Sequence, residues 1–283
     1  MIGYFDNRQE SIVNYISNSK IQKILNSPAK YFAYYGEGIR SPRTAAMRDG
    51  EIIHEAILRP HEFEKRLVVS EFENYRTKLA QEWRDGLMRV RPDVLICTKE
   101  EIEDYKKLID SVMSNKVVRN IIEKSTKETH GYAEDPVSGQ ILYSRPDIVT
   151  KDGMICDLKT TISASPDRFN KDQFFNGYGM QLSFYNYVHG IITGKHTEQN
   201  AFYIVVEKEY PHITCVYTLN AQFEKMADIK IRKGIDTIQH YMNIDPMFKD
   251  KLKWPGYFEG VMELDPTYGM MAGDPDFSDL IKL

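Results

Sequence analysis

Residues 144–161 constrain the possible fold more than any other segment, because their pattern predicts a β-hairpin. The segment reads SRPDIVTKDGMICDLKTT, with apolar β-forming residues on both sides of Asp152-Gly153. An Asp-Gly pair between two such runs is a strong signal for a hairpin turn. We therefore expect strands at about residues 140–150 and 154–160, joined by this turn.

The predicted hairpin gathers three charged side chains. Asp157 and Lys159 are two residues apart and project from one face of the second strand, whereas Leu158 points the other way into a core. Asp147 lies ten residues before Asp157, on the first strand. Two carboxylates and an ammonium group suit a site that holds Mg²⁺ beside a phosphodiester and orients the attacking water.

The acid-x-lysine triplet is not specific by itself. The chain also contains Asp104-Tyr-Lys106 and Asp228-Ile-Lys230, both in stretches of helical periodicity. Only Asp157 lies in an apolar β pattern with a second aspartate across a turn. A surface hairpin with a solvated ion pair is the simpler alternative.

Apolar periodicity elsewhere predicts an α/β fold, with a mixed central β-sheet flanked by helices and an N-terminal helical elaboration. Ser27-Pro28 can begin a helix, and Thr98 with Glu101 forms a capping-box signature. Further strands are expected at about 130–135, 201–208 and 212–219, and helices at about 44–58, 172–192 and 221–242.

Several motifs resemble those of the PD-(D/E)XK nuclease superfamily, in the branch of RecB-type and RecE-type (exonuclease VIII) nucleases. The central series is Arg145-Pro-Asp147, then Asp157-Leu-Lys-Thr-Thr161, then Gln181-x-x-x-Tyr185. Phage and prophage members of this group are also similar at Ser17-Asn-Ser19, Ser27-Pro28 with Tyr31, residues 44–54 and Trp254-Pro-Gly-Tyr257. The resemblance runs from about residue 17 to about residue 257, in the family's order.

The resemblance implies a role for each matching residue. The metal ligands would be His54, Asp147, Asp157 and the backbone carbonyl of Leu158. The catalytic group would comprise Asp147, Asp157, the lysine Lys159, the helix pair Gln181 and Tyr185, and the acid Glu128, for which Glu134 is an alternative. Mg²⁺ is the implied cofactor, and Mn²⁺ is expected to substitute for it.

His54 has a simpler interpretation as well. Residues 44–58 are expected to form a helix that stops before Pro60, and His54 shares a face with apolar residues of that helix. A core histidine is favoured by the pattern alone. Beside Asp147 and Asp157, a ligand is favoured, because neutral imidazole commonly binds metals.

Gln181 and Tyr185 are four residues apart and lie on one face of the predicted helix, which His189 continues. A half-buried helix with polar tips in solvent is the simpler interpretation of this pattern. Only their order after Asp147 and Asp157-x-Lys159 favours a place beside the active site.

The charge balance counts against a protein that binds nucleic acid through bulk charge. The chain has 37 basic and 41 acidic residues and a net charge of −4. DNA binding would then depend on basic residues in one groove and on metal ions at the phosphate. Candidate DNA contacts are Arg43, Arg48, Arg145, Thr160 and Tyr178. Two basic clusters are also candidates for phosphate contacts, although a solvated charged face suits each of their residues as well: Arg40, Arg43 and Arg48, and Arg76, Lys78, Arg84, Arg89 and Arg91.

The remaining composition sets outer limits. At 283 residues and 42% apolar, without a linker or low-complexity stretch, we expect one nuclease domain at 1–264 and an acidic tail at 265–283. The three cysteines stand singly and predict free thiols in a reducing compartment, with no iron–sulfur cluster. Signal-peptide and membrane-span patterns are missing, so that a cytoplasmic protein is expected.

Together these observations predict a metal-dependent exonuclease acting on double-stranded DNA ends. Degradation of the 5′-ended strand, an annealing-protein partner for the 3′ single strand, a ring-shaped homo-oligomer and a bacterial host with a phage or prophage origin are implied only by the resemblance. The alternatives are a structure-specific endonuclease of the same superfamily and a non-catalytic protein that binds DNA ends or a partner. The acidic tail suits either a poorly ordered terminus or a docking segment.

Overall fold

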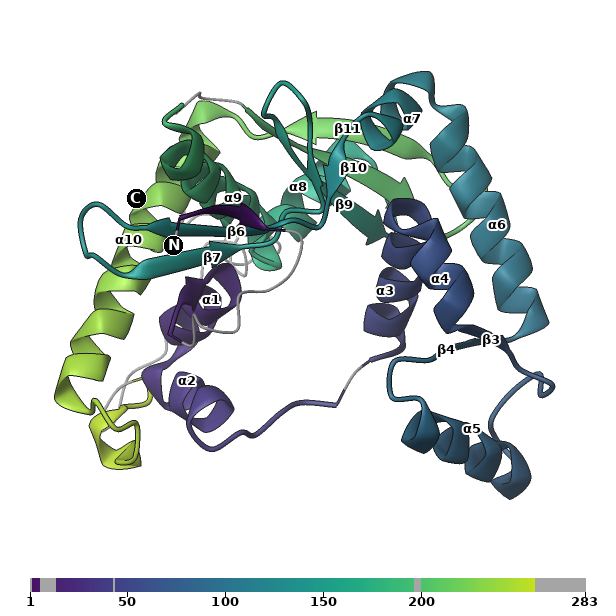
Figure 1. Ribbon diagram of the computed structural model, residues 1–283, viewed down its shortest axis with the longest axis horizontal. Coiled ribbons are helices and arrows are strands. Elements are labelled where there is room, and N and C mark those ends of the chain that lie inside the picture. The colour runs from purple at the N-terminus through teal and green to yellow at the C-terminus, as the bar shows by residue number, and fades with distance from the viewer. Residues whose placement is uncertain (1, 6–13, 43, 196–199, 258–283) are drawn as a thin grey trace, which may run out of the picture.

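The computed structural model describes residues 2–5, 14–42, 44–195 and 200–257 (Figure 1). The helices are α1 (Asn18–Asn26), α2 (Pro28–Tyr35), α3 (Ala45–Leu58), α4 (Pro60–Arg66), α5 (Lys78–Val90), α6 (Lys99–Ser114), α7 (Lys116–Glu123), α8 (Pro166–Phe175), α9 (Tyr178–Thr193), α10 (Ala221–Ile244) and the 3₁₀ turn η1 (Lys251–Lys253). The strands are β1 (Gly3–Phe5), β2 (Ile16–Ser17), β3 (Leu67–Val69), β4 (Leu95–Cys97), β5 (Thr126–Lys127), β6 (His130–Glu134), β7 (Ile141–Ser144), β8 (Ile148–Val149), β9 (Ile155–Thr161), β10 (Ala201–Glu207) and β11 (Thr214–Thr218).

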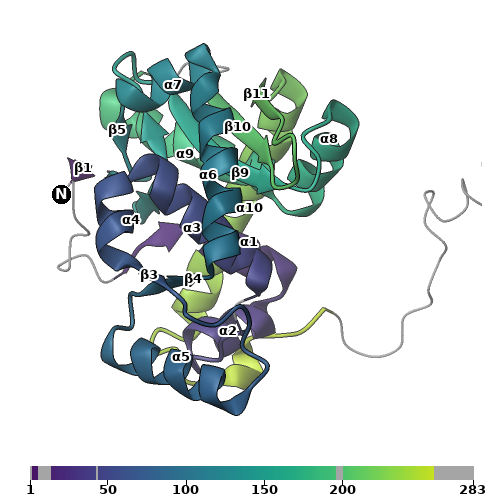
Figure 2. The ribbon, with the colours of Figure 1, turned by 90° about the vertical axis from the view of Figure 1, so that its right-hand side faces the viewer.

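A mixed sheet lies at the centre of the molecule, with the strand order β11-β10-β9-β8-β5 among the described residues. β9 runs parallel to β10, and the other neighbours in this sheet are antiparallel. Helices cover both faces: α3, α6 and α7 lie on one side and α8 and α9 on the other (Figures 1 and 2). The expected mixed α/β architecture is therefore confirmed.

The two faces of β9 bury different sets of side chains. Cys156 and Leu158 pack in the core with α3, α6 and α7, whereas Ile155 packs in the core with Leu182 of α9. Because side chains alternate along a strand, Asp157 and Lys159 share the face of Ile155. The strand therefore presents both charged groups to α9.

A second sheet, β1-β6-β7-β2, packs against α9, α10 and α1. Ile21 and Ile24 of α1 are buried there, and α10 crosses α1 at Gly234. An added Cβ at Gly234 would lie 2.5 Å from Cγ2 of Ile21, so that only glycine permits this approach. β3 and β4 form a separate parallel pair that connects α4 to α5 and α6, and α5 lies apart from both larger sheets (Figures 1 and 2).

Two predicted elements are interrupted. The strand expected at 140–150 is divided into β7 and β8, which belong to different sheets, because Pro146 has no N–H for a continuous ladder. The helix expected at 172–192 is divided into α8 and α9 at Gly177, whose φ is 69°. The strands β1 and β2 were not predicted.

Most other expected elements are confirmed. The hairpin turn forms with φ 82° at Gly153, and Thr150 N–H donates to the Met154 carbonyl across it. Thr98 and Glu101 form the capping box of α6. Ser27 accepts from the N–H of Lys30 at the start of α2. The predicted helices at 44–58 and 221–242 correspond to α3 and α10.

The cysteines Cys97, Cys156 and Cys215 are free thiols. Within the described ranges, no helix is long and apolar enough to cross a membrane. The predicted acidic tail at 265–283 lies outside the described residues.

A buried carboxylate, Asp135, joins the second sheet to α9 and α10. It has no exposed surface and accepts two hydrogen bonds from Arg232, each 2.8 Å long, and one of 2.6 Å from Tyr187. Ser138 donates to it from its backbone N–H as well. Burial alone would raise the pKa of Asp135, but these hydrogen bonds outweigh it and hold the pKa well below its ordinary value.

We expect Arg232→Met to lower the free energy of unfolding by about 3 kcal/mol, because it leaves Asp135 buried without its cation. Urea denaturation at pH 7 measures this change, and Lys233→Met, on an exposed neighbour in α10, is the control. The stabilisation is present above the ordinary pKa of 3.8 and is lost as the pH falls through the lowered pKa of the folded state. Equal stability of the two variants would show that the pair does not stabilise the fold.

Candidate active site

The register of β8 and β9 places the two aspartates side by side. Ile148 pairs with Cys156, so that Asp147 faces Asp157 one position further along, where β8 has ended. Oδ2 of Asp147 accepts a 2.7 Å hydrogen bond from the backbone N–H of Leu158. Since the N–H and C=O of a strand residue point to the same side, the Leu158 carbonyl is directed toward Asp147 as well.

A chain of contacts extends from Asp157 into α9. Nζ of Lys159 lies 2.6 Å from Oδ2 of Asp157 and donates a 2.9 Å hydrogen bond to Oε1 of Gln181. Nε2 of Gln181 donates in turn to the hydroxyl of Tyr185, at 2.9 Å. The structure therefore brings together Asp147, Asp157, Lys159 and the predicted helix pair.

His54 reaches the same place from α3, on the other side of the sheet. Its Nδ1 lies 3.4 Å from Oδ2 of Asp147, and its side chain is 24% exposed. His54 is therefore not fully enclosed in the core, and it lies next to the aspartates. His189, by contrast, is buried and its Nδ1 lies 2.6 Å from the hydroxyl of Tyr4.

Burial and charge act in opposite directions at this site. Burial raises the pKa of Asp147 to about 6; His54 opposes that shift, and Asp157 adds to it. For Lys159, burial alone would lower the pKa, but the attraction of Asp157 and Asp147 outweighs it and raises the pKa. Lys159 is therefore a protonated ammonium at neutral pH. Burial raises the pKa of the neighbouring Tyr185 far above its ordinary value.

Glu128 lies beside Asp147 rather than on a regular strand. It follows β5 with φ 48°, and its backbone N–H donates to the carbonyl of Asp147. Its carboxylate pairs with Arg59 at 2.9 Å and lies 3.8 Å from Arg145. Glu134, the alternative, is exposed on β6 of the other sheet.

Arg59 is a residue that the sequence reasoning missed. It terminates α3, and its guanidinium bridges Glu128 and the buried Glu55, the latter at 2.6 Å. The spacing of Glu55 and Arg59 by four residues in a helix was the available signal. Nothing in the sequence indicated that Glu128 would approach the same arginine.

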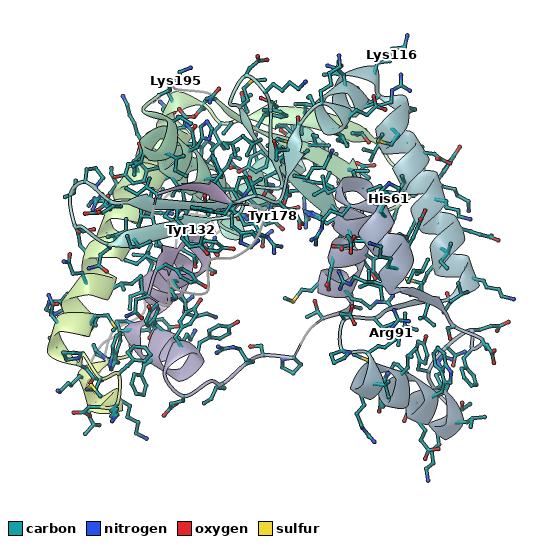
Figure 3. All side chains as sticks on the ribbon, in the orientation of Figure 1. His61, Arg91, Lys116, Tyr132, Tyr178 and Lys195 are labelled. Carbon is teal, nitrogen blue, oxygen red and sulfur yellow. The ribbon has the colours of Figure 1, made fainter. Side chains whose placement is uncertain are left out.

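The predicted DNA contacts are divided between several places. Tyr178 begins α9 with its ring 4.6 Å from Nζ of Lys159, at the centre of Figure 3. Thr160 faces α3, where an added Cβ on Gly50 would lie 3.7 Å from its hydroxyl. Arg145 is half exposed beside Glu128, whereas Arg48 forms ion pairs with Glu101 and Asp49. Arg43 lies outside the described residues.

The donor set can be tested against a divalent ion. Oδ2 of Asp157 is buried, and among the described residues no donor is aligned with it as a hydrogen bond, although Nζ of Lys159 is close. No three acidic, histidine or cysteine side chains of the described residues converge closely enough to enclose an ion. Mg²⁺ needs only one or two carboxylates together with waters and substrate oxygens. Asp147, Asp157 and the Leu158 carbonyl fit that requirement.

The mixed sheet carries an aspartate, an Asp-x-Lys pair and a neighbouring Gln-x-x-x-Tyr helix, in the order expected of a PD-(D/E)XK nuclease domain. The family model described as a PDDEXK-like domain of unknown function (DUF3799) matches residues 17–250, and the chain belongs to this family. The expected restriction-endonuclease-like fold is thereby confirmed.

Two solved structures give a more distant comparison. The crystal structure of a protein named "Putative exonuclease" from Eubacterium rectale has a TM-score of 0.54 at 12% identity and covers 81% of this chain and 82% of that chain. At this identity the likeness shows the fold alone. The crystal structure of SSO0001 is 14% identical over 64% of this chain and 84% of that chain, with a TM-score of 0.27 that supports no argument. No curated protein matches the chain.

Proposed function

We propose that this protein is a divalent-metal-dependent exonuclease that degrades double-stranded DNA from its ends. The observation that carries the proposal is the convergence of Asp147, Asp157 and Lys159 beside Gln181. The similarity in fold to a protein named as an exonuclease also supports this proposal. We place the chain in the RecE-type branch on its motif order.

In this mechanism, Lys159 holds the attacking water or a phosphate oxygen. An ammonium has three N–H donors, of which Gln181 takes one, while Asp157 holds the ammonium by a close charge contact. Its raised pKa favours a positioning role over proton abstraction. Gln181 and Tyr185 restrict the lysine to the face of β9 that carries Asp157, while His54 and the Leu158 N–H orient Asp147.

The metal would be held by Asp147, Asp157 and the Leu158 carbonyl, with His54 as a further candidate ligand. When bound, Mg²⁺ or Mn²⁺ activates water and stabilises the charge on the leaving oxygen. Glu128 would act indirectly, because its carboxylate is taken by Arg59 and approached by Arg145. Arg145, Thr160 and Tyr178 remain our candidates for DNA contacts nearest the site.

Further parts of the proposal depend on the motif resemblance alone. They are removal of the 5′-ended strand, an annealing protein as the partner for the 3′ strand, a ring-shaped homo-oligomer, and a phage or prophage protein acting in the host cytoplasm. We also propose that residues 1–264 form one nuclease domain, followed by the acidic tail.

The proposal is tested by digesting linear duplex DNA that is labelled separately at its 5′ and 3′ ends, with a covalently closed circle alongside. We expect Mg²⁺-dependent loss of the 5′-ended strand while the circle is spared. Cutting of the circle would favour a structure-specific endonuclease. A linear duplex left intact in Mg²⁺ would favour a non-catalytic end-binding protein.

A further inference from the structure

One segment of this acidic chain has a local excess of basic residues. Residues 18–43 contain five basic residues and one acid, Glu37, whereas the whole chain has a net charge of −4. α1 and α2 lie in this segment, on the opposite side of the molecule from α3, α4 and α5 (Figure 1). Segment 36–44 connects the two sides.

The two helices line an open hollow of about 430 Å³, within the range of about 300–1,000 Å³ typical of small-ligand sites. The residues of α1 that line the hollow are three or four positions apart and therefore share one face of the helix. The opposite face, with Ile21 and Ile24, is buried in the core. The lining residues are Ser19, Gln22, Lys23, Asn26, Lys30, Tyr34 and Tyr35.

Cations lie over aromatic rings on this surface. Nζ of Lys23 is 4.7 Å from the centre of the Tyr34 ring, and the guanidinium carbon of Arg40 is 3.7 Å from it. Lys30 contacts Tyr257. Within the part of the chain that the structure describes, no ion pair with a carboxylate involves Lys23, Lys30 or Arg40. Their charge is therefore available to an anion.

A hydrogen bond links the hollow to the residue that precedes α9 and the candidate active site. Nε2 of Gln22 donates to the carbonyl of Gly177 at 3.1 Å, and Gly177 directly precedes Tyr178, whose ring faces Lys159. An added Cβ at Gly177 would lie 2.8 Å from Nε2 of Gln22. The contact therefore places the hollow beside the residue that precedes Tyr178.

We propose that this α1–α2 surface binds single-stranded DNA next to the active site. Lysine and arginine suit the phosphates, and the partly exposed rings of Tyr34 and Tyr35 suit stacking with bases, a combination typical of single-strand binding. A duplex does not offer its base faces to Tyr34 and Tyr35, which favours an unpaired strand. This inference rests on the proposed nuclease function and names the form of DNA that the site handles.

The test is binding of a fluorescent oligothymidylate in EDTA, measured by anisotropy, so that cleavage does not enter. Lys23→Glu and Tyr34→Ala are each expected to weaken binding roughly tenfold, while Tyr34→Phe keeps the ring and binds like the wild type. Lys116→Glu makes the same charge change at the start of α7, far from α1 and α2 (Figure 3), and is the matched control. Circular dichroism confirms that each variant is folded.

Two results would overturn the inference. One is binding by Lys23→Glu and Tyr34→Ala within about twofold of the Lys116→Glu control. The other is a blunt duplex that competes as well as an unlabelled single strand does. If the wild type cleaves no DNA in Mg²⁺ and Lys23→Glu still loses binding, the proposed nuclease function fails while this surface stands.

Discussion

Asp157→Asn and Lys159→Met are each expected to reduce DNA cleavage by at least about 10³-fold, which corresponds to about 4 kcal/mol of lost transition-state stabilisation. Asp157→Asn keeps the size of the side chain and removes the charge that we expect to hold the metal. Lys159→Met keeps the length and removes the ammonium that lies 2.9 Å from Gln181. The rate of release of nucleotides from a labelled linear duplex measures both effects.

The chain supplies its own matched controls, because acid-x-lysine triplets also occur on helices. Asp104→Asn and Lys106→Met make the same two changes on α6, where Asp104 pairs with Lys107 at 2.9 Å in solvent. These controls should cleave like the wild type. Normal cleavage by Asp157→Asn or Lys159→Met in a folded protein would refute the assigned site.

The active-site hairpin was predictable because its determinants are local. The Asp-Gly pair predicted where the turn lies. The register was seen only in the structure, where Thr150 bonds to Met154 across a three-residue loop and Asp147 thereby faces Asp157. Alternation along β9 then fixes the shared face of Asp157 and Lys159. The spacing of Gln181 and Tyr185 predicted their common helix face, but their hydrogen bond to Lys159 depends on how α9 packs on the sheet.

Contacts between distant segments were not predictable in the same way. Pro146 is a local signal, yet where the chain goes after it depends on a second sheet whose β1 and β2 come from the N-terminus. The position of Glu128 beside Asp147 depends on a hydrogen bond from its backbone N–H to the Asp147 carbonyl, which the sequence does not indicate. Arg59 pairs with Glu128 over 69 positions of sequence, for which a single sequence carries no signal.

The net charge follows from the sequence, whereas the pairing of individual charges is known only from the structure. A net charge of −4 counts against binding through bulk charge, and that conclusion holds for the chain as a whole. The structure shows that several predicted basic contacts are already neutralised: Arg48 by Glu101 and Asp49, and Arg84 by Asp85. Lys23 of α1 and Lys30 of α2, which no sequence motif had singled out, form no carboxylate ion pair within the described part of the chain.

Divalent metal ions are expected to bind the site with an effect on stability that does not depend on catalysis. Asp147 and Asp157 adjoin each other in a buried place, and Asp157 destabilises the charged form of Asp147. A bound cation relieves this repulsion. At a concentration about 100 times the dissociation constant, it adds about 2.7 kcal/mol to the free energy of unfolding. We therefore expect Mn²⁺ or Mg²⁺ to raise the Tm by roughly 5 °C or more over the value in EDTA.

Asp147→Asn should raise the Tm in the absence of metal and abolish the stabilisation by metal. Without metal, the variant is expected to have a higher Tm than the wild type, because it removes one of two facing carboxylates while the amide oxygen still accepts from the Leu158 N–H. With metal, its Tm should stay unchanged, since the cation has lost a ligand. Asp104→Asn, an exposed aspartate on α6, should respond to metal like the wild type. A metal response in Asp147→Asn as large as that of the wild type would place the ion elsewhere, whatever the cleavage assay shows.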